Sequence, residues 1–351
     1  MGPPERRKSV SEGWRLLRLE SFEGMRILAV QLGAKYENEK TKFSRALRST
    51  ITFGLADLKT LIIFNPASGR AAEGKTLVKQ LEARLSAVTQ ATKKKGDAIR
   101  LARNAAKKGF GYIIAAGGDG TLNEIINGIG SQTDRVQVGL FPLGTGNDFA
   151  RTIALPSSAG DNIDILVKQQ TTRLDLVRIM SDRTRFFVNV SAGGFSGLVD
   201  EKLTRKIKRT WGPLAYVRSA AAALPELHGY RTKVVLDDME RLSLNLYNVI
   251  IGNCRFVAGG LPVAPEANPR DGQLDVILIS KVSKTKMVLL AGQMLLGKHL
   301  NSDAVLFRRA AKVSITSRPG MWFNADGEMI GNSPATFQVL PRALRFVVGR
   351  K

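Results

Sequence analysis

The sequence contains a single cysteine, Cys254, in 351 residues, so it can form no internal disulfide. That cysteine usage is typical of a reducing cytosol. Only two histidines are present, His228 and His299, and no cysteine–histidine cluster accompanies them, which argues against a zinc site. No segment reaches the roughly 18 uninterrupted apolar residues of a membrane-spanning helix, so no span is expected. We therefore predict a cytoplasmic location.

Acidic residues are also scarce, because 30 Asp and Glu stand against 53 Lys and Arg, for a formal net charge of +23. Such an excess predicts a polyanionic partner: nucleic acid, an anionic bilayer or nucleotide phosphates. Aromatic residues make up only 7% of the chain and no binding motif interleaves the basic positions, so nucleic acid is not expected. The densest basic run, 202–209, predicts peripheral contact with an anionic membrane surface, with a solvated helix face as the alternative. The oligomeric state stays open.

From residue 59 the hydrophobic pattern alternates between short apolar runs and helical periodicity. Strands are expected at 61–64, 112–116 and 137–141, and helices over 72–88, 97–108, 122–129 and from 149 onward. This spacing is typical of a parallel sheet with helices on both faces.

Beyond residue 160 the chain becomes rich in short β-strand patterns, interrupted by helical patterns at 197–224 and 284–296. The predicted strands cover 172–180, 185–191, 233–236, 247–254, 274–279, 312–316, 322–325, 335–339 and 344–348.

The predicted fold class is therefore α/β: an N-terminal three-layer parallel-sheet nucleotide domain and a C-terminal antiparallel β-sandwich-like domain. We place these domains at 57–160 and 161–351, with the last strand free to pack back on the first domain. Residues 1–56 form an extension without a usable motif.

A glycine-rich turn, Gly117-Gly118-Asp119-Gly120-Thr121, follows the strand predicted at 112–116 and opens a helix. Glycines allow backbone N–H groups to approach a bulky anion, and the helix start adds its positive end. Asp119 would then act through a metal ion or a donor hydroxyl. A plain strand-to-helix turn is the alternative interpretation.

Two further polar turns follow predicted strands. Asn65-Pro66-Ala67-Ser68-Gly69 offers an amide, a hydroxyl and bare backbone, and residues 144–148 (Gly-Thr-Gly-Asn-Asp) offer more side chains of the same kind. In a parallel sheet these turns lie at the carboxyl ends of the strands, where ligands bind. The pattern predicts a nucleotide crevice.

A fourth turn, Asn324-Ala325-Asp326-Gly327-Glu328, carries two carboxylates on either side of a glycine. Paired carboxylates can serve one hydroxyl, one accepting its proton and the other orienting it. A solvated hairpin tip is the alternative, since Asp-Gly is a common turn dipeptide.

In their order and spacing these four segments resemble the diacylglycerol kinase catalytic family, in particular its soluble bacterial lipid kinase branch. The resemblance covers nearly everything from 59 to 348. It implies an ATP- and Mg²⁺-dependent lipid kinase whose acceptor is a lipid alcohol, expected to be diacylglycerol, giving phosphatidic acid. It assigns the general base to Glu328 and the orienting role to Asp326.

The same resemblance implies a set of ATP-binding residues in the three polar turns and one further loop. They are Asn65, Pro66, Ala67, Ser68, Gly69, Thr92, Gly117, Gly118, Asp119, Gly120, Thr121, Leu122, Asn123, Thr145 and Asn147. The three lysines at 93–95 depart from the family's usual residues beside Thr92.

A loop at 262–275 resembles the family's structural Mg²⁺ loop. The implied ligands are the Asp271 carboxylate and the backbone carbonyls of Asn268 and Gln273, hard oxygen donors that suit Mg²⁺. An ordinary Pro/Asp/Gly-rich loop is the alternative. A cleft for the lipid tail is expected near Phe195, Phe256 and residues 211–224, which core packing explains equally well.

Two other functions are consistent with parts of the pattern. An NAD kinase relative would share the turn at 117–121, but the turns at Asn65, Thr145 and Glu328 match the lipid branch. A non-catalytic protein that binds membrane or nucleic acid on the same fold would be expected to lose one of the acidic residues, and Asp119, Asp326 and Glu328 are all present.

Overall fold

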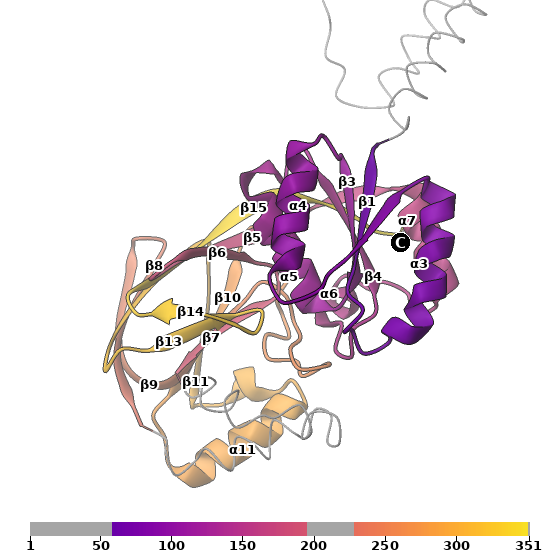
Figure 1. The fold of residues 1–351 in the computed structure, drawn as a ribbon. Coiled ribbons are helices and arrows are strands. Elements are labelled where there is room, and N and C mark those ends of the chain that lie inside the picture. Colours follow the sequence, from indigo (N-terminus) through magenta and orange to yellow (C-terminus); the bar gives the residue numbers. More distant parts are fainter. Residues whose placement is uncertain (1–57, 195–227, 350–351) are drawn as a thin grey trace, which may run out of the picture. The chain divides into compact units, whose positions relative to one another are not determined.

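The computed structural model describes residues 58–194 and 228–349 (Figure 1), and both ranges belong to one unit, Leu58–Lys351. The predicted extension at 1–56, the basic run at 202–209, the helix at 197–224 and Phe195 lie outside the described residues.

The first lobe is a parallel sheet covered by helices on both faces, as predicted. Its strands have the order β4-β3-β1-β2, and the apolar residues of β1 and β3 are buried on both sides, which explains their unbroken hydrophobic runs. Helices α3 and α7 pack on one face, and α4 and α5 pack on the other. The elements are β1 (Thr60–Phe64), α3 (Ala71–Leu85), β2 (Val88–Ala91), α4 (Asp97–Lys107), β3 (Tyr112–Gly117), α5 (Asp119–Ile129), η1 (Gly130–Gln132), β4 (Gln137–Pro142), α6 (Asp148–Thr152) and α7 (Ala159–Lys168).

The first lobe differs from the sequence prediction at four places. The helix predicted over 72–88 ends at Leu85, because Ser86 adopts a left-handed conformation (φ 48°) and the chain then enters β2. Strand β2 was not predicted, since this exposed edge strand reads Val-Thr-Gln-Ala without an apolar pattern. Helix α5 begins at Asp119 instead of Leu122, so the glycine-rich turn supplies its first turn. Helix α7 was also missed.

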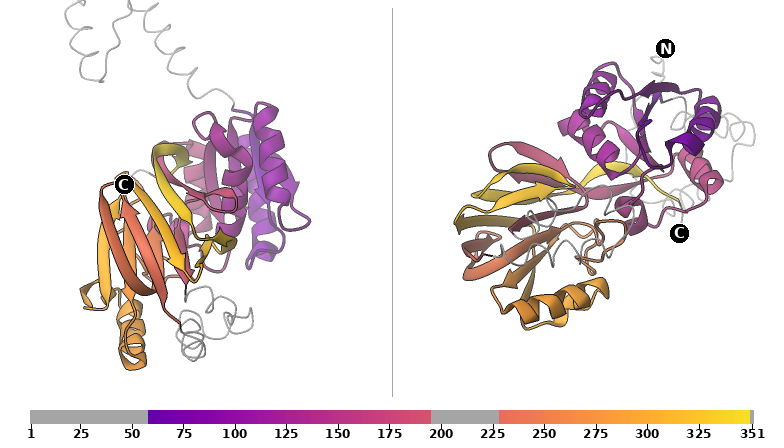
Figure 2. Two further views of the ribbon diagram at one scale, coloured as in Figure 1. Left: turned by 90° about the vertical axis from the view of Figure 1, so that its left-hand side faces the viewer. Right: turned by 60° about the horizontal axis from the view of Figure 1, so that its bottom comes forward.

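The second lobe consists of antiparallel strands around their own core (Figure 2). Strands β9 and β8 pair with each other, β9 also pairs with β7 and β10, and β12 joins β8 to β15. The elements are β5 (Thr171–Met180), β6 (Thr184–Phe187), β7 (Val190–Gly194), β8 (Tyr230–Leu236), β9 (Glu240–Gly252), β10 (Leu274–Ser280), α11 (Lys284–Leu295), η3 (His299–Asn301), β11 (Val305–Ala310), β12 (Lys312–Arg318), β13 (Trp322–Ala325), β14 (Glu328–Asn332) and β15 (Ala335–Val347).

The last strand links the two lobes. Strand β15 runs antiparallel to β5 in the second lobe and pairs in parallel with β4 of the first lobe at Phe346 and Val138. It replaces the two strands predicted at 335–339 and 344–348, because its pairing shifts register between Leu340 and Leu344 instead of breaking. The lobes therefore share one hydrogen-bonded network of strands.

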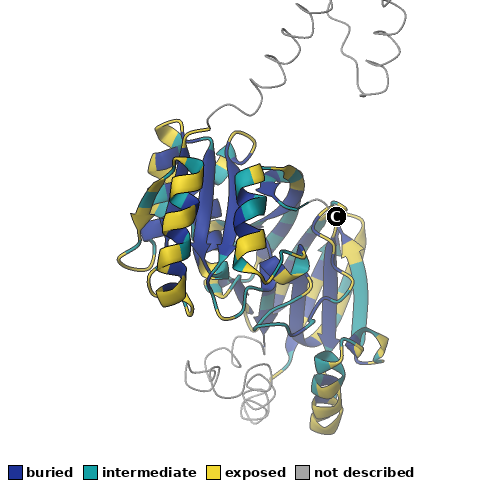
Figure 3. Cartoon of the chain, turned by 90° about the vertical axis from the view of Figure 1, so that its right-hand side faces the viewer, coloured by how far each residue is buried: buried dark blue, intermediate teal, exposed yellow. Residues whose placement is uncertain are grey.

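The strand predicted at 185–191 is divided into β6 and β7. Residues Val188 and Asn189 separate them, and their backbone N–H groups donate to the Asp326 carboxylate instead of to a neighbouring strand. Figure 3 shows the buried strands of both lobes and the exposed outer sides of the helices. Among the described residues, no helix is long and apolar enough to cross a membrane.

Candidate functional site

The three polar turns predicted from the sequence meet at the carboxyl ends of β1, β3 and β4. The Asn65 amide donates to Thr121 Oγ1 at 3.1 Å, which ties the first turn to the glycine-rich turn. A methyl group on Gly69 would meet Thr145 Oγ1 at 2.5 Å, and one on Gly144 would meet the Gly118 Cα at 2.6 Å. At Gly144 the obstacle is backbone, so only glycine fits there, whereas a side chain at position 69 would require the Thr145 hydroxyl to move.

The start of α5 presents backbone donors to this cluster. Its N-cap, Gly118, is extended and provides no side-chain cap, and the N–H groups of Thr121 and Leu122 donate to the Gly118 carbonyl. The N–H groups of Asp119 and Gly120 precede them and have no acceptor within a helix. Such a helix start suits an anion. The Leu122 side chain is fully buried in the core, so the contact with ATP predicted for Leu122 could come only from its backbone.

The Asp119 carboxylate already has partners within the chain. Its two oxygens accept from the backbone N–H groups of Asp148 and Phe149 at 3.0 and 3.1 Å. These N–H groups lie at the start of α6, so Asp119 caps a second helix from outside it. The sequence had suggested that Asp119 acts only through a ligand, whereas the structure gives it a role in fixing the turn at 144–148.

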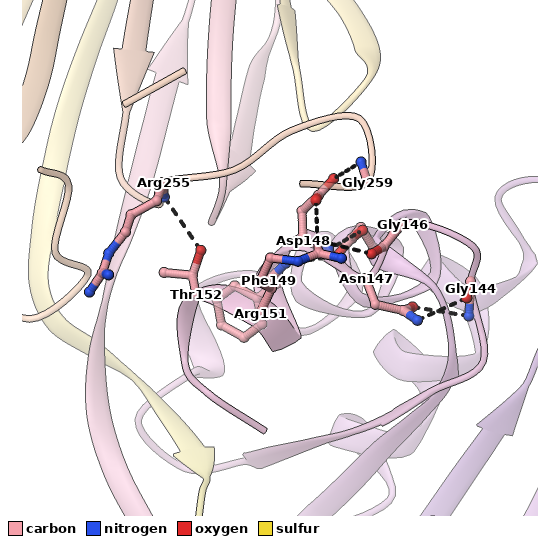
Figure 4. Close-up of polar contacts among 10 residues, drawn as sticks. Gly144, Gly146, Asn147, Asp148, Phe149, Arg151, Thr152, Arg255 and Gly259 are labelled. Atoms are coloured by element: carbon pink, nitrogen blue, oxygen red, sulfur yellow. Dashed lines mark hydrogen bonds and ion pairs between the residues drawn. The ribbon is translucent and has the colours of Figure 1, made fainter. Parts of the chain in front are cut away.

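Figure 4 shows how that turn is closed. Asn147, in the left-handed region at φ 51°, accepts from the Gly144 N–H at 3.0 Å and donates to the Gly144 carbonyl at 2.8 Å. Both ends of its side-chain amide are therefore used within the turn. Thr145 keeps its hydroxyl beside Gly69.

Asp148, which the sequence placed in this polar turn without assigning it a role, connects the turn to the second lobe. Its carboxylate accepts from the Gly259 N–H at 2.9 Å and pairs with Arg151 Nη1 at 2.8 Å (Figure 4). Burial raises the pKa of Asp148 to about 6; the charge of Asp119 adds to this increase, and the Gly259 N–H and the Arg151 guanidinium oppose it. A buried carboxyl thus links α6 to the loop after β9.

The predicted acidic turn lies between β13 and β14, as expected for a hairpin tip. Asp326 and Gly327 take φ values of 48° and 80°, which form a tight turn. Although Asp326 is only partly buried as a residue, its carboxylate accepts from the N–H groups of residues 188, 189 and 190 at 3.0, 3.0 and 3.2 Å, and from Asn123 Nδ2 at 2.9 Å.

Through these hydrogen bonds Asp326 anchors the turn. Burial raises the pKa of Asp326 to about 6 in spite of the opposing effect of its hydrogen-bond donors, and the charge of Asp119 adds to the increase. The Asn123 amide is also occupied, because it donates both to Asp326 and to the Phe186 carbonyl. A residue predicted for ATP thus attaches α5 to the acidic turn.

Glu328 is the accessible carboxylate of the pair. Its side chain is 42% exposed, and it forms an ion pair of 2.7 Å with Lys95 Nζ. Lys95 belongs to the first lobe, in the loop between β2 and α4, and its side chain is 75% exposed. The ion pair therefore places the predicted base beside the first lobe, in contact with an exposed positive charge.

The loop that carries Lys95 is held by two carboxylates. Asp97 accepts from the N–H groups of Lys93 and Lys94 at 2.8 and 3.2 Å, and Glu124 of α5 accepts from those of Gly96 and Ala98 at 2.8 and 3.1 Å. Sequence reasoning missed Lys95, Asp97 and Glu124. The one available signal was that three consecutive lysines stand where the family resemblance leads one to expect other residues.

Thr92 lies directly before this loop. Its N–H donates to the Phe64 carbonyl at 2.9 Å, so it sits beside the end of β1, next to the Asn65 turn. The structure thus brings Thr92 to the same edge of the sheet as the other residues predicted for ATP.

The predicted metal loop lies in the second lobe and is internally hydrogen-bonded. The Asn268 carbonyl accepts from the Arg270 N–H at 2.8 Å, and Asp271 Oδ1 accepts from the Gln273 N–H at 3.0 Å. Asp175 of β5, which sequence reasoning missed, anchors the loop by accepting from the Gly272 N–H at 2.8 Å. In the parts of the chain that the structure describes, no three acidic, histidine or cysteine side chains gather as a metal site.

Two family models together cover nearly all of the described chain. Residues 59–179 match the model described as diacylglycerol kinase catalytic domain, and residues 189–348 match the one described as YegS C-terminal NAD kinase beta sandwich-like domain. The first match contains the three polar turns and Lys95, and the second contains the acidic turn and the metal loop.

Curated relatives and solved structures agree with these matches. A protein of Staphylococcus haemolyticus (strain JCSC1435) named diacylglycerol kinase is 32% identical over 285 residues, which are 80% of this chain and 85% of the relative. One of Staphylococcus aureus (strain Newman), with the same name, is 30% identical over 80% of this chain and 89% of its own.

A crystal structure described as a diacylglycerol kinase from Bacillus anthracis str. Sterne shares the fold, with a TM-score of 0.65 and 22% identity over 83% of this chain and 97% of its own. A second crystal structure from that organism gives a TM-score of 0.70 at 23% identity, over 83% of this chain and 95% of its own. With its sequence relatives covered over most of their length, the chain belongs to the diacylglycerol kinase family.

Proposed function

We propose that this protein is an ATP-dependent lipid kinase that transfers the γ-phosphoryl group of ATP to the free hydroxyl of diacylglycerol and forms phosphatidic acid. The observation that carries the proposal is the position of Glu328. This accessible carboxylate, on a turn of the second lobe, is paired with Lys95 of the nucleotide lobe. A proton acceptor and a phosphate-binding edge therefore share one site.

The nucleotide would bind along the carboxyl ends of β1, β3 and β4. The uncapped start of α5 offers the N–H groups of Asp119 and Gly120 to the phosphates, and the turn at 65–69 and Thr145 form the neighbouring walls. Thr92 lies at the outer edge of the same surface. Lys95 supplies a positive charge that can leave Glu328 and meet the triphosphate.

In the reaction, the Glu328 carboxylate takes the proton of the lipid hydroxyl as the hydroxyl oxygen attacks the γ-phosphorus. The bond between that phosphorus and the bridging oxygen of ADP breaks, and ADP leaves. Phosphoryl transfer depends mainly on positioning and charge neutralisation, which a rigid turn provides. Asp326 is a positioning residue here, since its four hydrogen-bond donors hold the turn that carries Glu328.

We also propose that Mg²⁺ binds at Asn268, Asp271 and Gln273. Two carbonyls and one carboxylate are the hard donors that this ion accepts while keeping several waters. Nearby, Asp275 Oδ2 is buried without a hydrogen-bond partner, while Arg309 pairs with Asp275 Oδ1 at 3.1 Å and with Glu266 at 3.3 Å. A bound cation would supply positive charge where these carboxylates crowd.

The proposal is tested with labelled ATP and Mg²⁺ against a panel of lipid alcohols in mixed micelles: diacylglycerol, monoacylglycerol, a sphingoid base, phosphatidylglycerol and a polyprenol. We expect label in phosphatidic acid and a kcat/KM for diacylglycerol at least tenfold above that for any other acceptor. Preferred labelling of another lipid would overturn the choice of acceptor, and labelling of NAD alone would overturn the lipid kinase assignment.

A further inference from the structure

Helix α11 has an outward face that is apolar, although it lies on the surface. Val288, Leu289 and Leu296 are 58%, 64% and 72% exposed. At about 100° per residue, these three positions fall within an arc of about 100° on the helix and its C-terminal cap. Single exposed apolar residues are ordinary, but three on one arc form a patch.

The opposite side of α11 packs against the second lobe. Met287 and Leu290 are buried against the second-lobe sheet, in a cluster with Ile277 and Ile279 of β10. The helix is therefore apolar on both its inner and its outer side, a pattern that packing against its own lobe does not require. Figure 3 shows α11 projecting from the lobe with much of its surface exposed.

Among the described residues, the apolar face is bordered mainly by positive charge. Lys284 and Lys286 lie on either side of it in the first turn, Lys281 precedes the helix, Lys298 follows it, and all four are exposed. Residues 279–302 contain no Asp or Glu. Lys286 pairs at 2.7 Å with Asp303, but both side chains are largely exposed, and such a pair contributes little that binding could not replace.

The outer face of α11 lies on the same side of the second lobe as the loop after β9, which reaches the candidate site. The apolar cluster beneath α11 includes Val257 and Leu261 of that loop, and the buried His299 donates from Nε2 to the Val263 carbonyl at 2.9 Å. The N–H of Gly259, in the same loop, donates to Asp148 at the start of α6. A lipid layer touching α11 would therefore lie on the side from which this loop approaches the nucleotide lobe.

We propose that the outer face of α11 (Val288, Leu289, Leu296 and the flanking Lys281, Lys284, Lys286 and Lys298) docks the enzyme onto an anionic bilayer. The apolar side chains enter the interfacial region, and the lysines contact the negative headgroups. The inference rests on the proposed function only in that a lipid substrate resides in such a layer.

A second copy of the chain fits this face less well. A two-fold interface places a surface against itself, so lysines of one copy would meet lysines of the other, and the adjoining Asp303 already pairs with Lys286 of its own copy. An anionic bilayer complements both the charge and the apolar centre. We therefore commit to the bilayer as the occupant.

The test is co-sedimentation of the full-length protein with vesicles of phosphatidylcholine, with and without phosphatidylglycerol, at low and high salt. The triple variant Val288→Gln, Leu289→Gln, Leu296→Gln should lower the vesicle partition coefficient at least tenfold. The pair Lys284→Glu, Lys298→Glu should remove the preference for phosphatidylglycerol. The matched control is Met239→Gln, which changes an 82%-exposed apolar side chain in the turn after β8 and should leave partitioning unchanged.

Two further readouts separate the outcomes. Circular dichroism and urea unfolding of the variants confirm that they fold, and phosphorylation of a water-soluble short-chain diacylglycerol should stay within twofold of the wild type. Vesicle binding by the triple variant equal to that of the wild type would overturn the proposal. So would a wild-type dimer in sedimentation velocity that the triple variant loses, because the face would then bind a second copy. If the wild type phosphorylates no diacylglycerol, the proposed function fails while the binding result still decides the role of α11.

Discussion

The raised pKa of Asp148 makes a definite prediction about stability as a function of pH. Asp148 is buried between the start of α6 and the loop after β9, with 9% of its side chain exposed, and its pKa is raised from 3.8 to about 6. Its protonated form is therefore favoured in the folded state. Folding is most favoured by this group below pH 4, and that contribution is lost as the pH rises through 6.

The size of the effect follows from the shift. A difference of about two pKa units corresponds to about 3 kcal/mol between the protonated and ionised forms. Integrated over the part of this window where unfolding is easily measured, pH 4.5 to 7, the loss in the free energy of unfolding is about 2 kcal/mol. Asp148→Asn keeps the shape and a hydrogen-bond acceptor for the Gly259 N–H but cannot ionise.

Urea unfolding of the wild type and of Asp148→Asn across this range measures the difference. The variant should gain about 2 kcal/mol relative to the wild type as the pH rises from 4.5 to 7, since other titrating groups cancel. A difference that is independent of pH would refute the reasoning, because Asp148 would then titrate at the same pH in the folded and unfolded chains. A difference of opposite sign would mean that Arg151 and the Gly259 N–H outweigh burial.

Three other substitutions test the contacts around the site. Asp326→Ala leaves four hydrogen-bond donors without an acceptor and should lower the free energy of unfolding by about 4 kcal/mol in urea titrations. Asp326→Asn should give a loss between that of the wild type and that of Asp326→Ala. A loss below about 1 kcal/mol for Asp326→Ala would contradict the anchoring role. Asp119→Ala removes the external cap of α6, so it should lower the free energy of unfolding by about 1–2 kcal/mol and raise the KM for ATP severalfold. An unchanged KM would show that the cap does not contribute to nucleotide binding. Lys95→Met should change the free energy of unfolding by less than about 1 kcal/mol, because the ion pair of Lys95 is exposed. It should lower kcat/KM for ATP about tenfold, whereas the Lys93→Met control should not. Equal turnover of the two variants would show that Lys95 does not act in the site.

The parts of the site that follow a buried strand could be predicted from the sequence. Apolar runs such as 61–64 and 112–116 identify central strands, and in a parallel sheet the turns after them must share one edge. For that reason Asn65, Gly118 and Thr145 come together as expected. The edge strand β2 was not predicted, because its residues are mostly exposed and carry no apolar pattern.

The contacts across the lobes could not be predicted. Asn123 and Asp326 are 203 residues apart, and no local pattern reveals that one side chain binds the other. The same holds for the pairing of Lys95 with Glu328 and of Asp148 with Gly259. Each depends on how the second lobe packs against the first, which hydrophobic periodicity within one segment does not encode. The contact between Asn123, predicted to bind ATP, and Asp326, predicted as catalytic, also gives both side chains a structural role.

The substitution Glu328→Gln tests the central claim most directly, because it removes the proposed base and keeps the size of the side chain. A positioned general base contributes about 10²–10⁴-fold to a rate. We predict that kcat for phosphorylation of diacylglycerol falls by that factor, while the Kd for ATP stays within severalfold and the urea midpoint changes little, since the side chain is 42% exposed and its ion pair with Lys95 is at the surface. A Glu328→Gln enzyme that retains wild-type turnover would contradict the account.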